Sequence, residues 1–431
     1  MHAGAEARPV TDRRILLLSI GVQLALGLAF GHSFDARVFM ATGYLVGSGE
    51  NPYAASDLGA VFRHVGFDKL GPAGYPPPWP LVLGLLYLIS YAVVPNLLLY
   101  NLVLKLPVIA ANVGLAYLAV AVLKQLGASP AVARRAWVLM LFNPVLLYFG
   151  AAWGQVDAVA AALAIWALTL AWTRRTTASA GLLALSVCLK PIALPVLLVV
   201  LLFLWRDGWR PAARYAGVFA AVSIVAVVAP FAALGWDPSA ILHRWNGHFV
   251  LTGGLALSTS LRLWRDPLEL PGSWWLVGMV WIPALIVAGL ALRRGDGGLE
   301  DLLTKTTALV LVFFLTRARL AEPNVVLLVP LVLVLTVTGA LPRWSFAAVC
   351  AIPLAFSVVN HSPLELLFVA FPGAMESSIA WVERYEETAL VLKAALAVAW
   401  QVAGWWIVVL CFRWAPARAT VRDEALEAVR P

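Results

Sequence analysis

The sequence predicts an all-α polytopic membrane protein with about 12 transmembrane helices and with helices lying at the membrane interface in its first outer loop. Composition gives the first reason. Of the 431 residues, 62% are hydrophobic and only 13% are charged, and the mean hydropathy is +0.86. Soluble domains carry about 45–50% apolar and roughly 25% charged residues. The chain therefore has too little polar surface for a soluble enzyme, a disordered protein or a nucleic-acid-binding protein.

The second reason is a series of apolar runs close to the length of about 20 residues that a helix needs to cross a bilayer. We interpret as spans the segments 15–31, 97–123, 136–152, 155–173, 177–190, 191–206, 213–235, 273–292, 302–316, 324–341, 344–359 and 389–412. An even number of spans places both termini on one side. The arginine pairs at 134–135, 174–175 and 293–294 then share that side, which the positive-inside rule identifies as the cytoplasm.

We therefore expect a single integral domain, 1–431, in the plasma membrane, with cytoplasmic tails at 1–14 and 413–431. The net charge of +8 reports this orientation and not an anionic partner. The long extracytoplasmic segments are 32–96, 236–272 and 360–388. Because function in such proteins is usually carried by loops on a rigid scaffold, we expect the active site on the extracytoplasmic side.

Some segments do not fit the simple count. Residues 78–94 are apolar enough to cross the membrane, but counting them would move the arginine pairs outside, so we interpret them as an interfacial helix. The runs 177–190 and 191–206 are short for a crossing and meet at Lys190. Short or interrupted helices are tolerated where they line a cavity in the protein.

Two acidic residues stand out against these apolar runs. Asp35 is the first acid after the first span, and a partly desolvated carboxylate there could act as general base on an incoming hydroxyl. The alternative is pairing with Arg37 at a helix end. Asp157 follows Trp153-Gly154-Gln155 in an otherwise apolar run, which makes it a functional candidate. The alternative is an acid stabilised by a helix N-terminus.

Cationic residues near the same outer side indicate an anionic ligand. Lys190 is a compact charge between apolar runs, suited to a phosphate, although it could also extend to the surface as a snorkelling lysine. Arg317 and Arg319 oppose the charge bias, and a diphosphate or phosphodiester would explain them, with pairing to Glu322 as the alternative. The loops contain no Walker or G-x-G-x-x-G motif, which argues against direct use of a nucleotide. No motif requires a metal or another cofactor, although outer carboxylates could hold a divalent ion.

Taken in order, these motifs resemble the C-type glycosyltransferase (GT-C) superfamily, and more narrowly the polyprenyl-phosphate-mannose-dependent mannosyltransferases. The matching features are Asp35, the turns at Gly49, 51–53 and 75–77, the stretch 143–157 from Asn-Pro to Gly-Gln-x-Asp, and the Leu-Lys-Pro junction at Lys190. Many relatives carry Arg-x-His-Glu-Arg-Tyr where this chain has the turn 317–324, which lacks the histidine. The resemblance covers the order of elements from residue 15 to about 345.

The resemblance implies a GT-C-like fold in which the first loop forms helices parallel to the membrane over a cavity shared by donor and acceptor. It also implies that Asp35 aligns with the catalytic carboxylate and that a hexose, mannose by the resemblance, moves with inversion from a polyprenyl phosphate to a hydroxyl of a glycolipid, glycan or protein. Lys190, Arg317 and Arg319 would bind the donor phosphate. The expected substrate-binding residues are Gln155, Asp157, Tyr75, Glu322, Asn324 and His248.

Two other functions fit some of the same features. A secondary transporter also combines an even number of spans with broken helices and buried charge. The long first outer loop, the lack of a visible repeat and the concentration of polar residues near one face argue against it. A ligase that moves a whole lipid-linked glycan would use the same donor chemistry, but the modest outer loops favour transfer of a single sugar.

Overall fold

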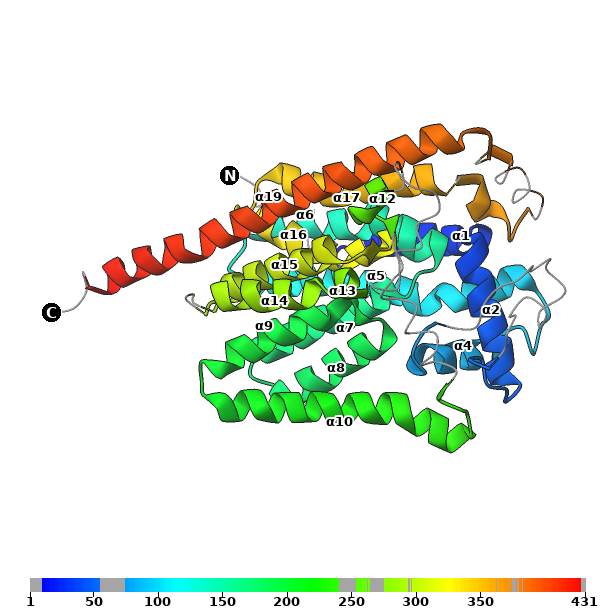
Figure 1. Ribbon diagram of the computed structural model, residues 1–431, viewed down its shortest axis with the longest axis horizontal. Helices are drawn as coiled ribbons and strands as arrows, with labels where there is room; N and C mark the ends of the chain where they lie inside the picture. The colour runs from blue at the N-terminus through cyan, green and yellow to red at the C-terminus, as the bar shows by residue number, and fades with distance from the viewer. Residues whose placement is uncertain are drawn as a thin grey trace, which may run out of the picture.

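The computed structural model describes residues 10–54, 74–239, 253–261, 263, 275–293, 295, 297–361, 363–371, 373, 377, 380–381 and 383–427. Within these ranges the chain is almost entirely helical, and most helices pack side by side along the long axis of the molecule (Figure 1). The one pair of strands in the described part is parallel and joins β1 (Gly253–Gly254) to β2 (Arg319–Leu320).

The helices have the following bounds: α1 (Arg13–Ala29), α2 (Ser33–Gly47), α4 (Pro78–Leu88), α5 (Leu97–Gln125), α6 (Pro130–Leu141), the π-helix η2 (Leu146–Trp153), α7 (Asp157–Trp172), α8 (Thr176–Leu189), the 3₁₀-helix η3 (Pro191–Ala193), α9 (Leu194–Trp205), α10 (Trp209–Leu234), α12 (Ser258–Leu261), α13 (Trp275–Gly278), α14 (Trp281–Ala291), α15 (Leu299–Thr316), the 3₁₀-helix η5 (Glu322–Leu327), α16 (Leu328–Val337), α17 (Arg343–Asn360), the 3₁₀-helix η6 (Pro363–Leu367) and α19 (Glu386–Glu427).

Each segment interpreted as a span contains one of these helices, or two across a break. Five helices of the described chain are long and apolar enough to cross a membrane, and a sixth crossing is added if the bent pair α1 and α2 is one span. The all-helical membrane architecture is therefore supported, while the count of twelve crossings stays a prediction. The five lie at Leu97–Gln125, Pro130–Trp153, Trp209–Leu234, Arg343–Asn360 and Glu386–Arg413.

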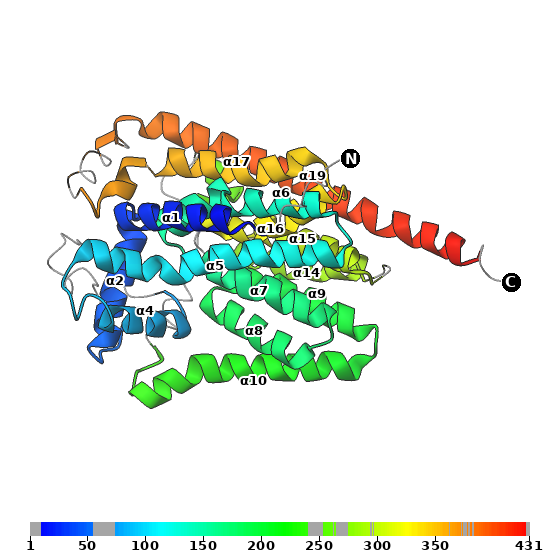
Figure 2. The same ribbon diagram turned by 180° about the vertical axis from the view of Figure 1, so that it is seen from behind.

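The two ends of the bundle differ in character. Helix α1 begins and α19 finishes at the same end (Figures 1 and 2). Basic residues pair with acids at this end, since Arg134 lies 3.9 Å from Asp12 and Arg174 donates to Asp207. Helices α2 and α4 lie at the opposite end, where α2 turns by 84° from the direction of α1.

The core lies around α15 and α16, in which nearly every side chain is buried. Helix α7 packs against α5 and α8 with alanine at many of its buried positions. Small residues let helix backbones approach closely inside a membrane, where packing and not the hydrophobic effect drives association. Helix α10 lies at the edge of the bundle and has only three buried residues, so most of its apolar surface faces outward.

The third predicted span is broken into α6 and the π-helix η2, and η2 ends near α2. Asn143 lies just after the end of α6, and its Oδ1 accepts from the amide of Val145 at 2.9 Å. The π-helix η2 follows and stops at Gly154, whose φ is +94°. Such π-turns are common at functional sites. A Cβ at Gly154 would also lie 2.9 Å from Cε of Lys105, so glycine is required here both for conformation and for space.

Helix α5 fixes the C-terminal end of α1. Asn101 Nδ2 donates to the carbonyls of Gly27 and Phe30, both at 2.8 Å. Lys105 Nζ donates to the carbonyl of Ala152 at 2.8 Å and to that of Phe30. The last carbonyls of a helix have no partner within it, and amide or cationic donors there are stabilising. These contacts set the corner between α1 and α2 against the end of η2.

Because Asn101 serves several carbonyls, we expect Asn101→Ala to lower the free energy of unfolding by about 1–3 kcal/mol, the cost of leaving buried acceptors without donors. The measurement is a denaturation curve of the purified protein in detergent. Gln125→Ala is the matched control, because this amide is exposed at the end of the same helix. Equal stability of the two variants would contradict a capping role for Asn101.

Candidate functional site

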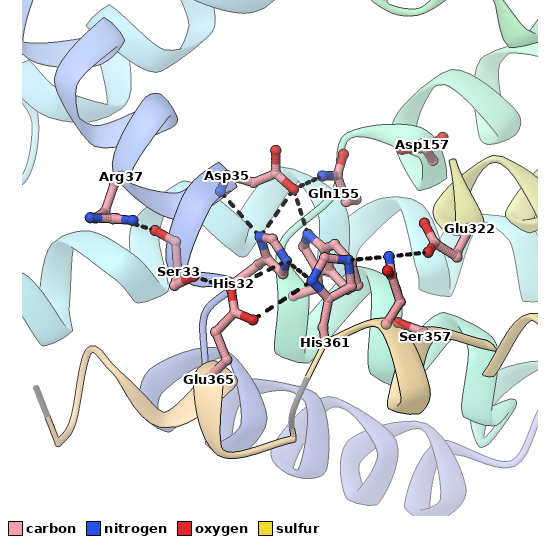
Figure 3. Close-up of polar contacts among 12 residues, drawn as sticks. His32, Ser33, Asp35, Arg37, Gln155, Asp157, Glu322, Ser357, His361 and Glu365 are labelled. Carbon is pink, nitrogen blue, oxygen red and sulfur yellow. Dashed lines mark hydrogen bonds and ion pairs between the residues drawn. The ribbon is translucent and has the colours of Figure 1, made fainter. Parts of the chain in front are cut away.

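Polar side chains from four parts of the chain meet at the end of the bundle that carries α2 (Figure 3). Figure 3 shows those from the corner between α1 and α2, the turn between η2 and α7, and the segment that ends α17 and enters η6. The fourth part is the break between α8 and η3, which contributes Lys190. All four are junctions where a helix stops. Irregular backbone with polar side chains is tolerated at membrane depth only where protein or a cavity satisfies it.

The carboxylate of Asp35 is held through one oxygen. Its Oδ2 accepts from Trp153 Nε1 at 2.7 Å and from Gln155 Nε2, and it lies 3.4 Å from His32 Nδ1. Among the described residues no hydrogen bond engages Oδ1, which points away from the cluster in Figure 3. Arg37, the alternative partner, donates its Nε to the carbonyl of Ser33. The side chain of Asp35 is 17% exposed, so this free oxygen can meet a ligand.

A buried ion pair lies beside Asp35. Lys190 Nζ is 2.5 Å from Asp157 Oδ2, and the Asp157 side chain is fully buried whereas that of Lys190 is 16% exposed. Lys190 Nζ also donates to Gln155 Oε1 at 3.3 Å. Gln155 therefore links the two charged groups, since its amide nitrogen serves Asp35 and its oxygen serves Lys190. These contacts argue against the alternative that Lys190 only snorkels to the membrane surface, because its ammonium group pairs with a buried carboxylate.

Tyr75 covers this group from the first outer segment. Its hydroxyl donates to Gln155 Oε1 at 3.4 Å, and its ring centroid lies 6.0 Å from Lys190 Nζ. Burial raises the pKa of Tyr75 well above its usual range, and the carboxylates of Asp35 and Asp157 add to the effect. The hydroxyl therefore stays protonated and acts as a donor. The structure thus brings together five of the residues that the sequence singled out.

Histidines extend the network away from Asp35. The His32 ring stacks on Trp153 with centroids 3.9 Å apart, and its Nε2 lies 3.2 Å from His361 Nδ1. His361 Nε2 is 2.9 Å from Asn360 Nδ2, which donates to Glu322 Oε1 at 2.8 Å. Glu322 is therefore connected to Asp35 through three side chains and has no contact with it.

Burial determines the direction of the pKa shift for one titratable side chain in this network, but it is outweighed for another. It lowers the pKa of His32 to about 4, although the nearby carboxylates of Asp35 and Glu365 oppose the shift. Burial would raise the pKa of Glu365, but hydrogen bonds from His361 and Ser33 and the charge of the neighbouring histidines outweigh it and hold this pKa at about 2. The network at neutral pH thus combines a neutral His32 with an ionised Glu365.

The arginine turn stands next to this group. The Arg317 guanidinium lies 5.1 Å from the Phe313 ring centroid, and burial together with the charge of Arg319 lowers the pKa of Arg317 to about 10. Arg319 is exposed in β2, and its charge acts on the hydroxyl of Tyr75. No ion pair between described residues joins either arginine to Glu322, the alternative that the sequence offered.

The remaining candidates are less connected. Asn324 is buried in η5, and its Oδ1 has no hydrogen-bond partner in the described part of the chain. His248 lies outside the described residues. The sequence assigned no role to Trp153, His32, His361 or Glu365. The available signals were weak: a histidine three residues before Asp35, and a histidine and glutamate four residues apart.

The Asp157–Lys190 pair makes a test of stability possible. We expect Lys190→Met to lower the free energy of unfolding by about 3–5 kcal/mol, because it leaves the Asp157 carboxylate buried without its partner. The double variant Asp157→Asn with Lys190→Met removes both charges, so it should recover a large part of this loss. Denaturation curves of the three proteins form a double-mutant cycle. Strictly additive losses would show that the two side chains are not coupled.

Comparison with known proteins adds one finding. Residues 32–206, less than half of the chain, match the sequence model of a family described as Alpha-(1->6)-mannopyranosyltransferase, N-terminal domain. No curated protein sequence matches the chain. The matched segment contains Asp35, Gln155, Asp157 and Lys190, and it confirms the resemblance that the motifs predicted. The match and the apolar helices together support a mannosyltransferase-like membrane protein.

Proposed function

We propose that this protein transfers a mannosyl group, with inversion, from a polyprenyl-phosphate donor to a hydroxyl of an extracytoplasmic glycolipid, glycan or protein. The observation that carries the proposal is the geometry of Asp35. One carboxylate oxygen is fixed by Trp153 and Gln155 while the other is open, and the Lys190 cation lies on the other side of the same glutamine. A base and a phosphate-binding cation are the two groups that this reaction needs.

In the proposed reaction, the acceptor hydroxyl oxygen attacks C1 of the sugar from the face opposite the phosphate. The bond between C1 and the phosphate oxygen breaks, and its electron pair leaves with the polyprenyl phosphate. Asp35 Oδ1 takes the proton of the hydroxyl. Donors on Oδ2 hold the carboxylate in one orientation, which lowers the entropic cost of bringing base and nucleophile together.

Charge neutralisation of the leaving group would come from Lys190 with Arg319 and Arg317. Asp157 balances Lys190 in the resting state, so a phosphate has to share that cation or draw on the arginines of the neighbouring turn. Electrostatic stabilisation is strong where water is excluded and the charged groups are already in place. Tyr75, Glu322, Asn324 and His248 stay candidates for contacts to the sugar or the acceptor, with Gln155 and Asp157.

The orientation of the protein in the membrane follows from the charge of its loops. The bundle end with the basic loops, including Arg134 and Arg174, is the cytoplasmic one by the positive-inside rule, so the site at the other end is extracytoplasmic. A lipid-linked donor suits that side, because nucleotide sugars are made in the cytoplasm and the loops carry no nucleotide motif. The match to a mannosyltransferase family favours this enzyme over a secondary transporter.

The first test replaces the proposed base. Asp35→Asn keeps the shape of the side chain but removes its basicity, so we expect transfer of mannose from a polyprenyl-phosphate donor to fall about 100-fold or more. The assay uses purified, correctly folded protein with radiolabelled donor and membrane acceptors. Asp12→Asn, at the opposite end of the bundle, is the matched control and should keep its activity. Near-normal turnover in Asp35→Asn would reject the assignment.

The second test concerns donor binding. We expect Arg319→Gln to raise the donor concentration for half-maximal rate about 10-fold to 100-fold, the effect of losing one charge-assisted hydrogen bond of about 1.5–3 kcal/mol. The acceptor concentration for half-maximal rate should not change. Arg343→Gln changes an exposed arginine at the start of α17 and serves as control. An unaltered donor dependence in Arg319→Gln would remove this arginine from the phosphate site.

A further inference from the structure

Two histidines and a glutamate converge beside the proposed base, from positions far apart in the sequence. His32 lies at the corner between α1 and α2, His361 directly follows α17, and Glu365 lies in η6 (Figure 3). One ligand atom from each lies within 4.8 Å of the other two. The mechanism proposed above uses none of these three side chains directly, so their convergence needs a separate explanation.

The distances within this triad match those expected around a metal ion. His32 Nε2 lies 3.2 Å from His361 Nδ1 and 3.7 Å from Glu365 Oε1, and His361 Nδ1 lies 3.6 Å from Glu365 Oε2. Zn²⁺ holds nitrogen and oxygen ligands at about 2.0–2.2 Å in a tetrahedron, which puts neighbouring ligands roughly 3.3–3.6 Å apart. The two nitrogens thus have about the separation of two corners of such a tetrahedron. The Glu365 carboxylate faces each nitrogen with a different oxygen, and one of these oxygens would take the third corner.

The groups around the triad suit a metal site. His32 Nδ1 accepts from the Asp35 amide at 3.3 Å and lies 3.4 Å from Asp35 Oδ2. A metal-binding histidine usually donates its second N–H to a carboxylate, and Asp35 Oδ2 is placed to accept it. Ser33 Oγ donates to Glu365 Oε1 and orients that carboxylate. With a cation on Nδ1, His361 Nε2 would carry a proton. Asn360 would then turn its amide to present Oδ1 and give up its bond to Glu322.

The solvent exposure of the triad and the chemistry of its side chains also fit a metal site. The His32 side chain is only 5% exposed, but those of Glu365 and His361 are 17% and 23% exposed, so a water or a substrate oxygen can reach the fourth position. Two imidazoles and one carboxylate favour a transition-metal ion over Mg²⁺ or Ca²⁺, which prefer oxygen ligands.

We propose that His32 Nε2, His361 Nδ1 and the Glu365 carboxylate form a binding site for a divalent transition-metal cation of the Zn²⁺ type. The cation joins the corner between α1 and α2 to the segment after α17. It also fixes the tautomer of His32, because a metal on Nε2 leaves the proton on Nδ1, which then donates to Asp35 Oδ2 in place of accepting from the Asp35 amide. The ion thus acts as a positioning element for Asp35 through His32.

The experiment measures metal content directly. Full-length protein purified in detergent is incubated with excess ZnCl₂, desalted and analysed by inductively coupled plasma mass spectrometry. We expect close to one Zn²⁺ for each chain, and near-background zinc in His361→Gln and Glu365→Gln. Glu387→Gln makes the same change at an exposed glutamate in the first turn of α19, and it should retain the metal.

Two further readouts separate metal binding from misfolding. Co²⁺ in place of Zn²⁺ should give the intense visible absorption of a low-symmetry site in wild-type protein, and Zn²⁺ should raise Tm for wild type but not for the two triad variants. Wild-type protein that binds no stoichiometric Zn²⁺ or Co²⁺ while folded would overturn the proposal and leave a hydrogen-bonded histidine pair. These readouts do not involve sugar transfer, so their outcome is independent of the proposed function.

Discussion

The contact of Gln155 with both Asp35 and Lys190 is the interaction on which the site depends. In a bundle this apolar, an ionised group without a partner is costly. Asp157 compensates Lys190 within the core, and the amide of Gln155 then connects that pair to Asp35, which is open on one side. The arrangement places the Asp35 carboxylate and the Lys190 cation a single side chain apart without a direct ion pair between them, so that the proposed base and the proposed phosphate-binding group both remain open to a ligand.

Breaks in the helices make this arrangement possible. Asn143 and the π-helix η2 widen the third predicted span, and Gly154 turns the chain so that Trp153 and Gln155 both face Asp35. Pro191 ends α8 one residue after Lys190 and leaves that lysine at the junction. A continuous helix would direct these side chains around its axis. Stopping the helix concentrates them at one end of the bundle, where backbone groups still find partners such as Lys105.

The sequence predicted the positions of the helices well, because hydropathy is a local property and each span has its own apolar run. It also predicted that Asp35, Gln155, Asp157, Lys190 and Tyr75 belong together, because helix direction alternates and places their junctions at one end. It did not predict the histidine triad. His32 and His361 are 329 residues apart, and neither has a local pattern that separates it from a solvated histidine. The sequence also does not fix the number of membrane crossings, because some apolar runs form helices, such as α14, that are shorter than a bilayer crossing needs.

His32 connects the two halves of the site. The family match ends at residue 206, yet His361, from well beyond that point, contacts His32 beside Asp35. His32 stacks on Trp153 of the matched segment, presents Nδ1 to Asp35 and presents Nε2 to His361. The matched segment therefore supplies the proposed base and its cation, while the later part supplies the groups that hold His32 in place. One imidazole thus contacts both sides, and its orientation depends on partners from the matched segment and from the later segment. The C-terminal part of the chain therefore contributes side chains to the candidate site and does more than add membrane helices.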